Sequence, residues 1–248
     1  MSYEEAFQRI ERWIIKGSTK RWLNLDKCDL TEIPPLPPNL RKLNISFNPI
    51  TSLKGLPPNL KHLDTSVTKI TTLDELPNKL TYLECTNCSL LTDINIMIDT
   101  LRYINISSCE QIKTVRRLPN ELRVFNVNFC YSLETIDGLP QKMVRFYIQD
   151  SWVETLPSFP DTLQFFQCIG TCLQELPTLP LHLKELNIGC NSISKFPTLP
   201  PGILHVQIQE TGIPYINPDD IPSSVISLVT DFYKDPRLNF DKSIQSSA

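Results

Sequence analysis

The sequence has few glycines, few histidines and no long apolar run. With 7 glycines in 248 residues, it holds no glycine-rich loop of the kind that cradles phosphates. The three histidines, His62, His182 and His205, are too widely separated to join in one site. A Cys-His or Ser-His-Asp mechanism needs its groups within hydrogen-bond reach of one another. We therefore expect neither an enzyme nor a bound cofactor.

Charge and hydropathy exclude two further classes of partner. No apolar stretch approaches the roughly 20 residues that a membrane-spanning helix needs, and the chain opens with Glu4, Glu5 and Arg9 where a secretion signal would be apolar. The formal charge is -3, with acidic and basic residues interleaved, which predicts no basic stripe for a phosphate backbone. We expect a cytoplasmic protein that binds neither membrane nor nucleic acid.

Proline, in contrast, is abundant, with 21 residues. Because proline fixes φ and lacks an N–H, this number without glycine favours recurring extended segments over long helices. The prolines recur because the chain repeats, with one apolar anchor every 20 to 22 residues. The eleven anchors are Leu23, Leu43, Leu63, Leu83, Ile104, Phe125, Phe146, Phe166, Leu186, Val206 and Leu228.

Each anchor belongs to a short apolar-x-apolar pattern, whose period of two is typical of a β-strand. Most strands are followed by a Leu-Pro linker, as in residues 36–40 and 56–60, and we expect these linkers to be extended, polyproline-like backbone. One such strand cannot bury its apolar side alone, but stacked repeats can. The pattern therefore predicts a repeat solenoid with a parallel β-sheet on its concave face and an extended convex face without helices.

The position five residues after each anchor supports this register. It carries a small polar residue or a cysteine, a side chain that can be buried and still bond neighbouring backbone where the strand ends. The members of this polar column are Cys28, Asn48, Thr68, Cys88, Cys109, Cys130, Ser151, Thr171, Asn191 and Thr211.

Residues 40–50 and 183–193 follow the pattern LxxLxLxxN, and over positions 20 to 230 the chain resembles the leucine-rich-repeat family. Within it, the repeats are similar to the short 20-residue Leu-Pro class of bacterial type III effectors, the YopM and IpaH kinds. The resemblance implies a horseshoe-shaped binding module that meets its partner on the concave face. IpaH proteins also carry a ubiquitin-ligase domain with a cysteine nucleophile, and because only about 18 residues follow the last repeat, we expect that activity to be absent.

The repeats depart from that pattern in the middle of the chain. The linker over residues 94–100 contains no proline, and the fifth and sixth repeats each have one residue more than the 20-residue pattern. We expect the curvature of the solenoid to change locally there.

Both ends of an open solenoid need a cover. Residues 2–5 form a capping box, and they lead into apolar residues at helical spacing that predict an N-terminal cap helix within residues 1–19. These apolar residues are Ala6, Phe7, Ile10, Trp13 and Ile14. Leucine-rich repeats are expected over 20–230 and a C-terminal cap and tail over 231–248. The candidates for closing the last repeat are Val229, Phe232, Tyr233 and Leu238.

Cys85 and Cys88 have the CxxC spacing of half a zinc site. Cys85, however, falls at an inward strand position, Cys88 belongs to the polar column, and no second pair follows at ligand spacing. We expect structural thiols, without bound metal or disulfides. Cys172 and Cys190 fall outside the interior positions and are expected to be the accessible thiols.

The residues directly before and after each anchor should face the concave surface. The position after the anchor is mostly Asn, Asp or Gln, which suits a solvated sheet. The position before it is aromatic or basic on several adjacent strands, and such residues dominate protein-binding hot spots. The predicted partner-binding residues are Tyr82, Tyr103, Val124, Arg145, Tyr147 and Phe165. Alternatively, these side chains only cover one another across strands and brace the sheet.

These observations predict a non-catalytic protein-protein interaction module whose concave face binds a protein partner. We expect it in the cytoplasm, and in a host cytoplasm if it is an effector or a viral protein. A second hypothesis is the substrate-recognition subunit of a ubiquitin-ligase assembly whose catalytic part is another chain. A third is a structural or capsid-associated protein. Copurification of a ligase would favour the second and self-association the third.

Overall fold

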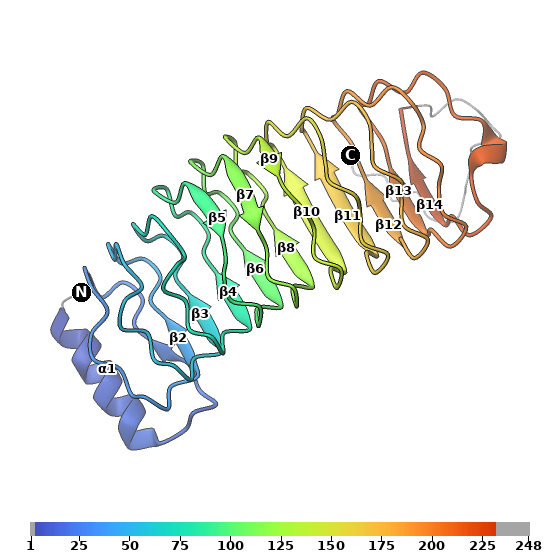
Figure 1. Ribbon diagram of the computed structural model, residues 1–248. Coiled ribbons are helices and arrows are strands. Elements are labelled where there is room, and N and C mark those ends of the chain that lie inside the picture. The colour runs from blue at the N-terminus through green and yellow to red at the C-terminus, as the bar shows by residue number, and fades with distance from the viewer. Residues whose placement is uncertain (1–2, 232–248) are drawn as a thin grey trace, which may run out of the picture.

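The computed structural model describes residues 3–231, which form one helix followed by an arched stack of short strands (Figure 1). Eleven strands make the main sheet, in the order of the chain and all parallel. They are β1 (Leu23–Asn24), β2 (Lys42–Asn44), β3 (His62–Asp64), β4 (Tyr82–Glu84), β6 (Tyr103–Asn105), β8 (Val124–Asn126), β10 (Arg145–Gln149), β11 (Phe165–Ile169), β12 (Glu185–Asn187), β13 (His205–Gln207) and β14 (Ser227–Val229).

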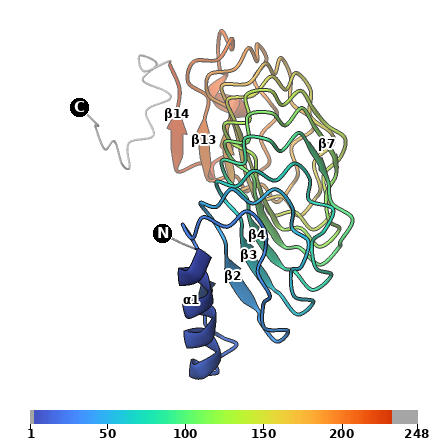
Figure 2. The same ribbon diagram turned by 90° about the vertical axis from the view of Figure 1, so that its left-hand side faces the viewer.

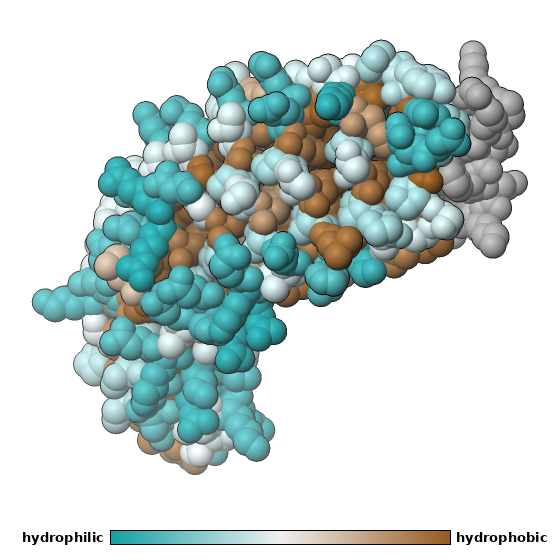
Figure 3. Space-filling model, turned by 45° about the vertical axis from the view of Figure 1, so that its right-hand side comes forward, coloured by the Kyte–Doolittle hydropathy of each residue, from teal (hydrophilic) through white to brown (hydrophobic). Residues whose placement is uncertain are grey.

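The strands pair anchor to anchor. Leu23 lies opposite Leu43 at one end of the sheet, and the same register continues until Val206 lies opposite Leu228 at the other. The main sheet follows the concave side of the arch (Figures 1 and 2), whose bent outline is also visible in the space-filling view (Figure 3). The predicted solenoid, with one parallel strand per repeat and the sheet on its concave face, is confirmed.

The interior is built from the anchors and the apolar residues at fixed distances from them. Phe125, Phe146 and Phe166 are the largest fully buried side chains, and their ring centroids stack at 5.9 and 5.6 Å. They occupy anchor positions that are leucine or isoleucine in the preceding repeats. Burial of a side chain of this size stabilises the fold by about 1.5–3 kcal/mol. Because each ring packs against the rings of adjacent turns, this energy stabilises the contacts between neighbouring turns.

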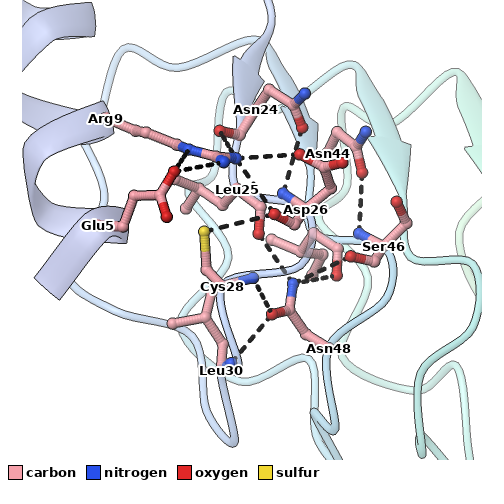
Figure 4. Close-up of polar contacts among 11 residues, drawn as sticks. Glu5, Arg9, Asn24, Leu25, Asp26, Cys28, Leu30, Asn44, Ser46 and Asn48 are labelled. Atoms are coloured by element: carbon pink, nitrogen blue, oxygen red, sulfur yellow. Dashed lines mark hydrogen bonds and ion pairs between the residues drawn. The ribbon is translucent and has the colours of Figure 1, made fainter. Parts of the chain in front are cut away.

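The polar column satisfies the backbone where the strands end. The amide nitrogen of Asn48 donates to the carbonyls of Leu25, Ile45 and Ser46 at 2.9, 2.9 and 3.1 Å. Its carbonyl oxygen accepts the N–H groups of Cys28 and Leu30, each at 3.0 Å (Figure 4). One buried side chain therefore closes five backbone groups that would otherwise be unpaired.

Thiols take the same place in the middle of the solenoid. The Sγ atoms of Cys88 and Cys109 donate to the carbonyls of Thr65 and Cys85 at 3.3 and 3.2 Å, and Cys130 donates to Ile106 at 3.3 Å. Each acceptor lies two residues after an anchor, as Leu25 does for Asn48. A thiol makes fewer bonds than an amide, but it satisfies the same carbonyl, which is why cysteine replaces asparagine here without a change of register.

The convex side carries a second parallel sheet that the sequence analysis did not predict. It consists of β5 (Asp93–Asn95), β7 (Thr114–Arg117) and β9 (Thr135–Ile136), opposite the main sheet (Figure 2). The backbone there is extended as expected, but it is also paired. None of the residues in the three strands is proline, so each of their N–H groups can join a ladder.

The helix α1 (Tyr3–Lys16) covers the first turn of the solenoid. Ala6, Ile10 and Trp13 are buried at i, i+4 and i+7. Phe7 and Ile14 were expected on this face but are exposed, because a helix meeting one short strand buries only a narrow stripe. The capping box includes Ser2, which lies outside the described residues.

A charged bridge fixes the helix to the first repeat. Arg9 contacts the carboxylate of Glu5, one turn earlier, at 2.8 Å and that of Asp26 at 3.0 Å. Its guanidinium also donates to the backbone carbonyl of Asp26 at 3.1 Å (Figure 4). The pKa of Arg9 is raised, first by the hydrogen bond to Glu5 and then by that to Asp26 against a cost of burial, so the bridge stays charged.

A left-handed residue follows each strand of the main sheet through β13. These residues lie four positions after the anchor and have φ between 50° and 61°. They are Lys27, Phe47, Val67, Asn87, Ser108, Phe129, Asp150, Gly170, Cys190 and Glu210. Only Asn, Asp and Gly among these residue types favour such a conformation, so the stacking of the turns imposes it on the rest.

At the C-terminal end, a 3-10 helix over Pro218–Asp220 precedes β14, and the side chain of Asn217 caps it by accepting the N–H of Asp219. Val229 is partly buried in the last strand. The other expected capping residues, Phe232, Tyr233 and Leu238, lie outside the described residues. Among residues 3–231 no helix is long and apolar enough to cross a membrane.

We predict that Asn191→Ala lowers the free energy of unfolding by about 2–4 kcal/mol, because it leaves several buried backbone groups without partners. Asn191 donates to the carbonyls of Cys168, Ile188 and Gly189 and accepts from Thr171. Urea denaturation followed by circular dichroism measures the change. The exposed neighbour Ser192→Ala is the matched control. Equal stability of the two variants would contradict the structural role of the polar column.

Candidate protein-binding surface

The concave surface is formed by the residues that flank each anchor. The residue before the anchor pairs with its counterpart on the next strand, so these side chains stand in one continuous row, here called the concave row. From β2 to β13 it contains Lys42, His62, Tyr82, Tyr103, Val124, Arg145, Phe165, Glu185 and His205. Trp22 precedes it directly before β1.

An aromatic cluster occupies the N-terminal part of the row. The rings of Tyr82 and Tyr103 stack at 4.3 Å, nearly parallel, and His62 lies 5.5 Å from Tyr82. Trp22 meets His62 edge to face at 6.0 Å. Glu84 accepts hydrogen bonds from the hydroxyls of Tyr82 at 2.6 Å and Tyr103 at 3.1 Å. Partial burial, together with the adjacent Glu84 carboxylate, raises the pKa of both tyrosines, so both hydroxyls remain donors.

A second cluster occupies the C-terminal part. The guanidinium carbon of Arg145 lies 3.7 Å from the centroid of the Phe165 ring, and its Nη1 donates to the hydroxyl of Tyr147 at 3.2 Å. Phe165 and Tyr147 also line a shallow hollow of about 220 Å³, with Glu185 and His205 on its far side. A cation held over a ring in this way is fixed in direction but still partly exposed to solvent.

The six residues predicted to bind a partner therefore form two clusters, and Val124 lies between them in the row. Ring stacking does not continue through Val124, because valine has no ring. Sequence reasoning left out Trp22 and His62, although both stand in the same column of the repeat as the predicted residues. Trp22 and Tyr82 also line a hollow of about 560 Å³ beside the exposed Phe47 and Val67.

The expectation of no basic stripe is wrong for one edge of the main sheet. Two residues before the anchors, where the strands begin, the exposed side chains Arg41, Lys61, Arg102 and Arg123 lie on four of five successive turns, with Thr81 between them. Backbone hydrogen bonds of 2.8–2.9 Å join these five residues in order. The stripe was missed because acidic residues between the repeats hide it in the linear sequence. Reading this column at the repeat spacing would have revealed it. We call these four residues the basic row.

The cysteines divide as expected. Six are buried, Cys172 is partly buried and Cys190 is exposed. The thiols of Cys85 and Cys88 are 3.3 Å apart inside the solenoid. In the described part of the chain, no group of three or more His, Cys, Asp or Glu side chains is arranged to hold a metal ion.

A leucine-rich-repeat family model matches residues 39–63. A search of curated protein sequences finds no match. Among solved structures, YopM from Yersinia enterocolitica is 22% identical, with 83% of this chain and 67% of that chain covered and a TM-score of 0.35. A Shigella effector leucine-rich-repeat domain is 23% identical (84% and 76% covered, TM-score 0.38), and a Leptospira interrogans leucine-rich-repeat protein is 16% identical (84% and 71%, TM-score 0.41).

We predict that His62 titrates below the ordinary histidine range, because partial burial and the positive charges of Lys42 and Lys61 lower its pKa. Lys61→Gln should raise this pKa, and Lys195→Gln, far along the solenoid, should not. The pKa of His62 is about 6.5 in the unfolded chain and lower in the folded protein, so the unfolded chain binds the imidazole proton more tightly. The contribution of His62 to the free energy of unfolding therefore falls as the pH drops from about 6.5 through the folded pKa. NMR titration of the imidazole measures the effect. A midpoint at or above the ordinary value would refute it.

We also predict that a thiol reagent labels Cys172 and Cys190 before the six buried cysteines. The Sγ of Cys190 lies 3.3 Å from the Glu210 carboxylate, and the pKa of this thiol is raised by partial burial and by that contact. Glu210→Gln should therefore speed labelling of Cys190, because the thiolate is the reactive form. Mass spectrometry over a time course follows each site, with Glu185→Gln as control. Earlier labelling of Cys85 or Cys88 would contradict the buried arrangement.

Proposed function

We propose that this leucine-rich-repeat solenoid is a non-catalytic module that binds a protein partner on its concave face. The observation that carries the proposal is the C-terminal cluster, in which Arg145 lies over Phe165 and bonds to Tyr147 on the open surface of the sheet. Arginine and tyrosine are enriched at binding hot spots because they combine large contact area with polar groups.

Preorganisation favours an interface at this cluster. The Arg145 side chain is held by the Phe165 ring on the neighbouring strand and by the Tyr147 hydroxyl on its own strand. Binding of a partner would therefore cost little additional side-chain conformational entropy. The hollow lined by Phe165 and Tyr147 offers space for a partner side chain. Concave pockets beside fixed aromatic and arginine groups are the usual form of an interface anchor.

Bracing of the sheet accounts better for part of the aromatic cluster. Tyr82 and Tyr103 stack on each other and share Glu84, which is a stabilising cross-strand arrangement without any partner. Arg145 is different, because its guanidinium is a charged group on the partly exposed concave surface, where hydrogen-bond acceptors of a partner could reach it. We therefore assign the binding role first to Arg145, Phe165 and Tyr147, with Tyr103 contributing from the adjoining cluster.

We predict that Tyr103→Ala, Arg145→Ala and Phe165→Ala each weaken partner binding by about 1–3 kcal/mol, as expected for truncated anchors. Affinity capture with the immobilised wild-type protein, followed by mass spectrometry, identifies candidate partners. Isothermal titration calorimetry with the purified partner then measures each affinity, and differential scanning calorimetry measures each melting temperature.

The control variant is Asn44→Ser, which lies outside the C-terminal cluster and its hollow. The side-chain oxygen of Asn44 accepts the N–H group of Ser46, and a serine hydroxyl can still do so. This control should bind as the wild type does. If the triple variant keeps its affinity while its melting temperature falls, the side chains only brace the sheet and the concave-face proposal is wrong.

A further inference from the structure

The basic row is a line of exposed positive charge. Arg41, Lys61, Arg102 and Arg123 are all exposed, and among residues 3–231 none of the four takes part in an ion pair. Backbone hydrogen bonds between successive turns align the Cα atoms of these residues. The spacing of the charges is therefore fixed by the stacking of the turns and not by a flexible loop. Like charges at neighbouring positions repel one another, and binding of an anion relieves that repulsion.

Two nearby groups respond to this positive field. The pKa of Glu121 is lowered, first by its hydrogen bond to Lys142 and then by charges that include Arg102 and Arg123. The pKa of His62 is lowered by burial and then by Lys42 and Lys61. Glu121 lies near Arg123, and its lowered pKa favours the negatively charged carboxylate. His62 lies next to Lys61, and its lowered pKa favours the neutral imidazole. Three members of the basic row, Lys61, Arg102 and Arg123, therefore contribute to these shifts.

The dimensions of the row fit an extended chain. Adjacent strands are about 4.8 Å apart, so the four spacings from Arg41 to Arg123 span roughly 19 Å. An extended peptide rises about 3.3 Å per residue, and roughly six residues cover that length. A single small anion would meet only one or two of the four cations. A short segment with several carboxylates would meet all of them.

Charge on the rest of the face distinguishes a peptide from a nucleic acid. Asp64 and Glu84 lie at the other ends of β3 and β4, three residues after Lys61 and after Thr81, which stands in line with the basic row. A polynucleotide is broad and charged along its whole length, so it would bring phosphates toward these carboxylates. A narrow peptide along the edge avoids them.

We propose that the basic row binds an acidic, extended segment of the protein partner, which runs across the beginnings of the strands. The inference rests on the proposed function, because the same partner supplies the segment while its folded part meets Arg145 and Phe165. The N-terminal half of the face in view in Figure 3 is dominated by hydrophilic residues, whereas more apolar surface shows toward the C-terminal half. One partner would thus be recognised by charge at one end and by apolar contact at the other.

The test uses the full chain and a fluorescein-labelled peptide of twelve residues that alternates Glu and Ser. The same peptide with Gln in place of Glu, and a twelve-nucleotide oligothymidine, are the comparison probes. We expect the Glu peptide to bind, the Gln peptide not to bind, and binding to weaken as salt is raised, since surface charges are screened within about 10 Å at 0.1 M. Fluorescence anisotropy measures all three affinities.

The decisive variant combines Arg41→Glu, Arg102→Glu and Arg123→Glu, and it should weaken binding of the Glu peptide at least about tenfold. These positions are exposed, and circular dichroism checks that the fold is retained.

The matched control reverses three exposed lysines outside the row, Lys69, Lys113 and Lys195, and so has the same net charge. It should bind the Glu peptide within about twofold of the wild type. Equal loss in both variants would show a net-charge effect and overturn the proposal. Tighter binding of oligothymidine than of the Glu peptide, lost in the first variant, would instead make the row a nucleic-acid surface.

The variant Arg145→Ala with Phe165→Ala separates this proposal from the proposed function. Both residues lie on turns beyond the basic row, so the Glu peptide should bind this variant as well as the wild type. If partner capture is unaffected in this variant but the peptide still needs the row, the concave-face proposal fails and the acidic-segment proposal stands. If the Gln peptide binds as tightly as the Glu peptide, the acidic-segment proposal fails alone.

Discussion

The whole structure depends on the return of the chain to a parallel strand once in every repeat. Each turn must bring an anchor opposite the preceding one, from Leu23 to Leu228, and must do so within 20 to 22 residues. Pairing between turns then satisfies the backbone of the strands, and the anchors bury one another. A misplaced turn would lose both contributions together, which is why the repeat length varies so little.

The end of each strand is the most constrained part of the turn. The backbone there cannot continue the ladder, so buried Asn, Thr or Cys side chains supply the missing partners. The chain then turns through a left-handed residue, even where that residue is Val67 or Phe129. Conformational cost at these positions is offset by the packing of the turns on either side.

The same regular spacing arranges chemistry on the surface. Side chains that are 20 residues apart in sequence become neighbours about 4.8 Å apart, so a column of the repeat is a line on the molecule. The concave row and the basic row are two such lines, one aromatic with Arg145 within it and one cationic. Their proximity along the strands gives the concave side both apolar anchors and a directed electrostatic field, a combination suited to recognising one partner in one orientation.

The convex side shows how a small local change alters a regular fold. In most repeats a Leu-Pro linker follows the strand, but residues 94–100 contain no proline. There and in the next two turns the extended segments pair as β5, β7 and β9. The absence of proline is visible in the sequence. Pairing also needs three successive segments to lie side by side in register, and this depends on how the turns stack.

The sequence alone determined the register, the parallel sheet, the buried polar column and the helix that covers the first turn. These follow from local periodicity and from residue types that have few alternatives, such as Asn48 within a run of apolar positions. Only the tertiary structure decided that Phe7 and Ile14 face solvent, that Val124 divides the aromatic residues into two clusters, and that Arg145 lies over Phe165. The reason is that side-chain direction and contact between turns depend on how neighbouring repeats stack in three dimensions, which no single repeat encodes.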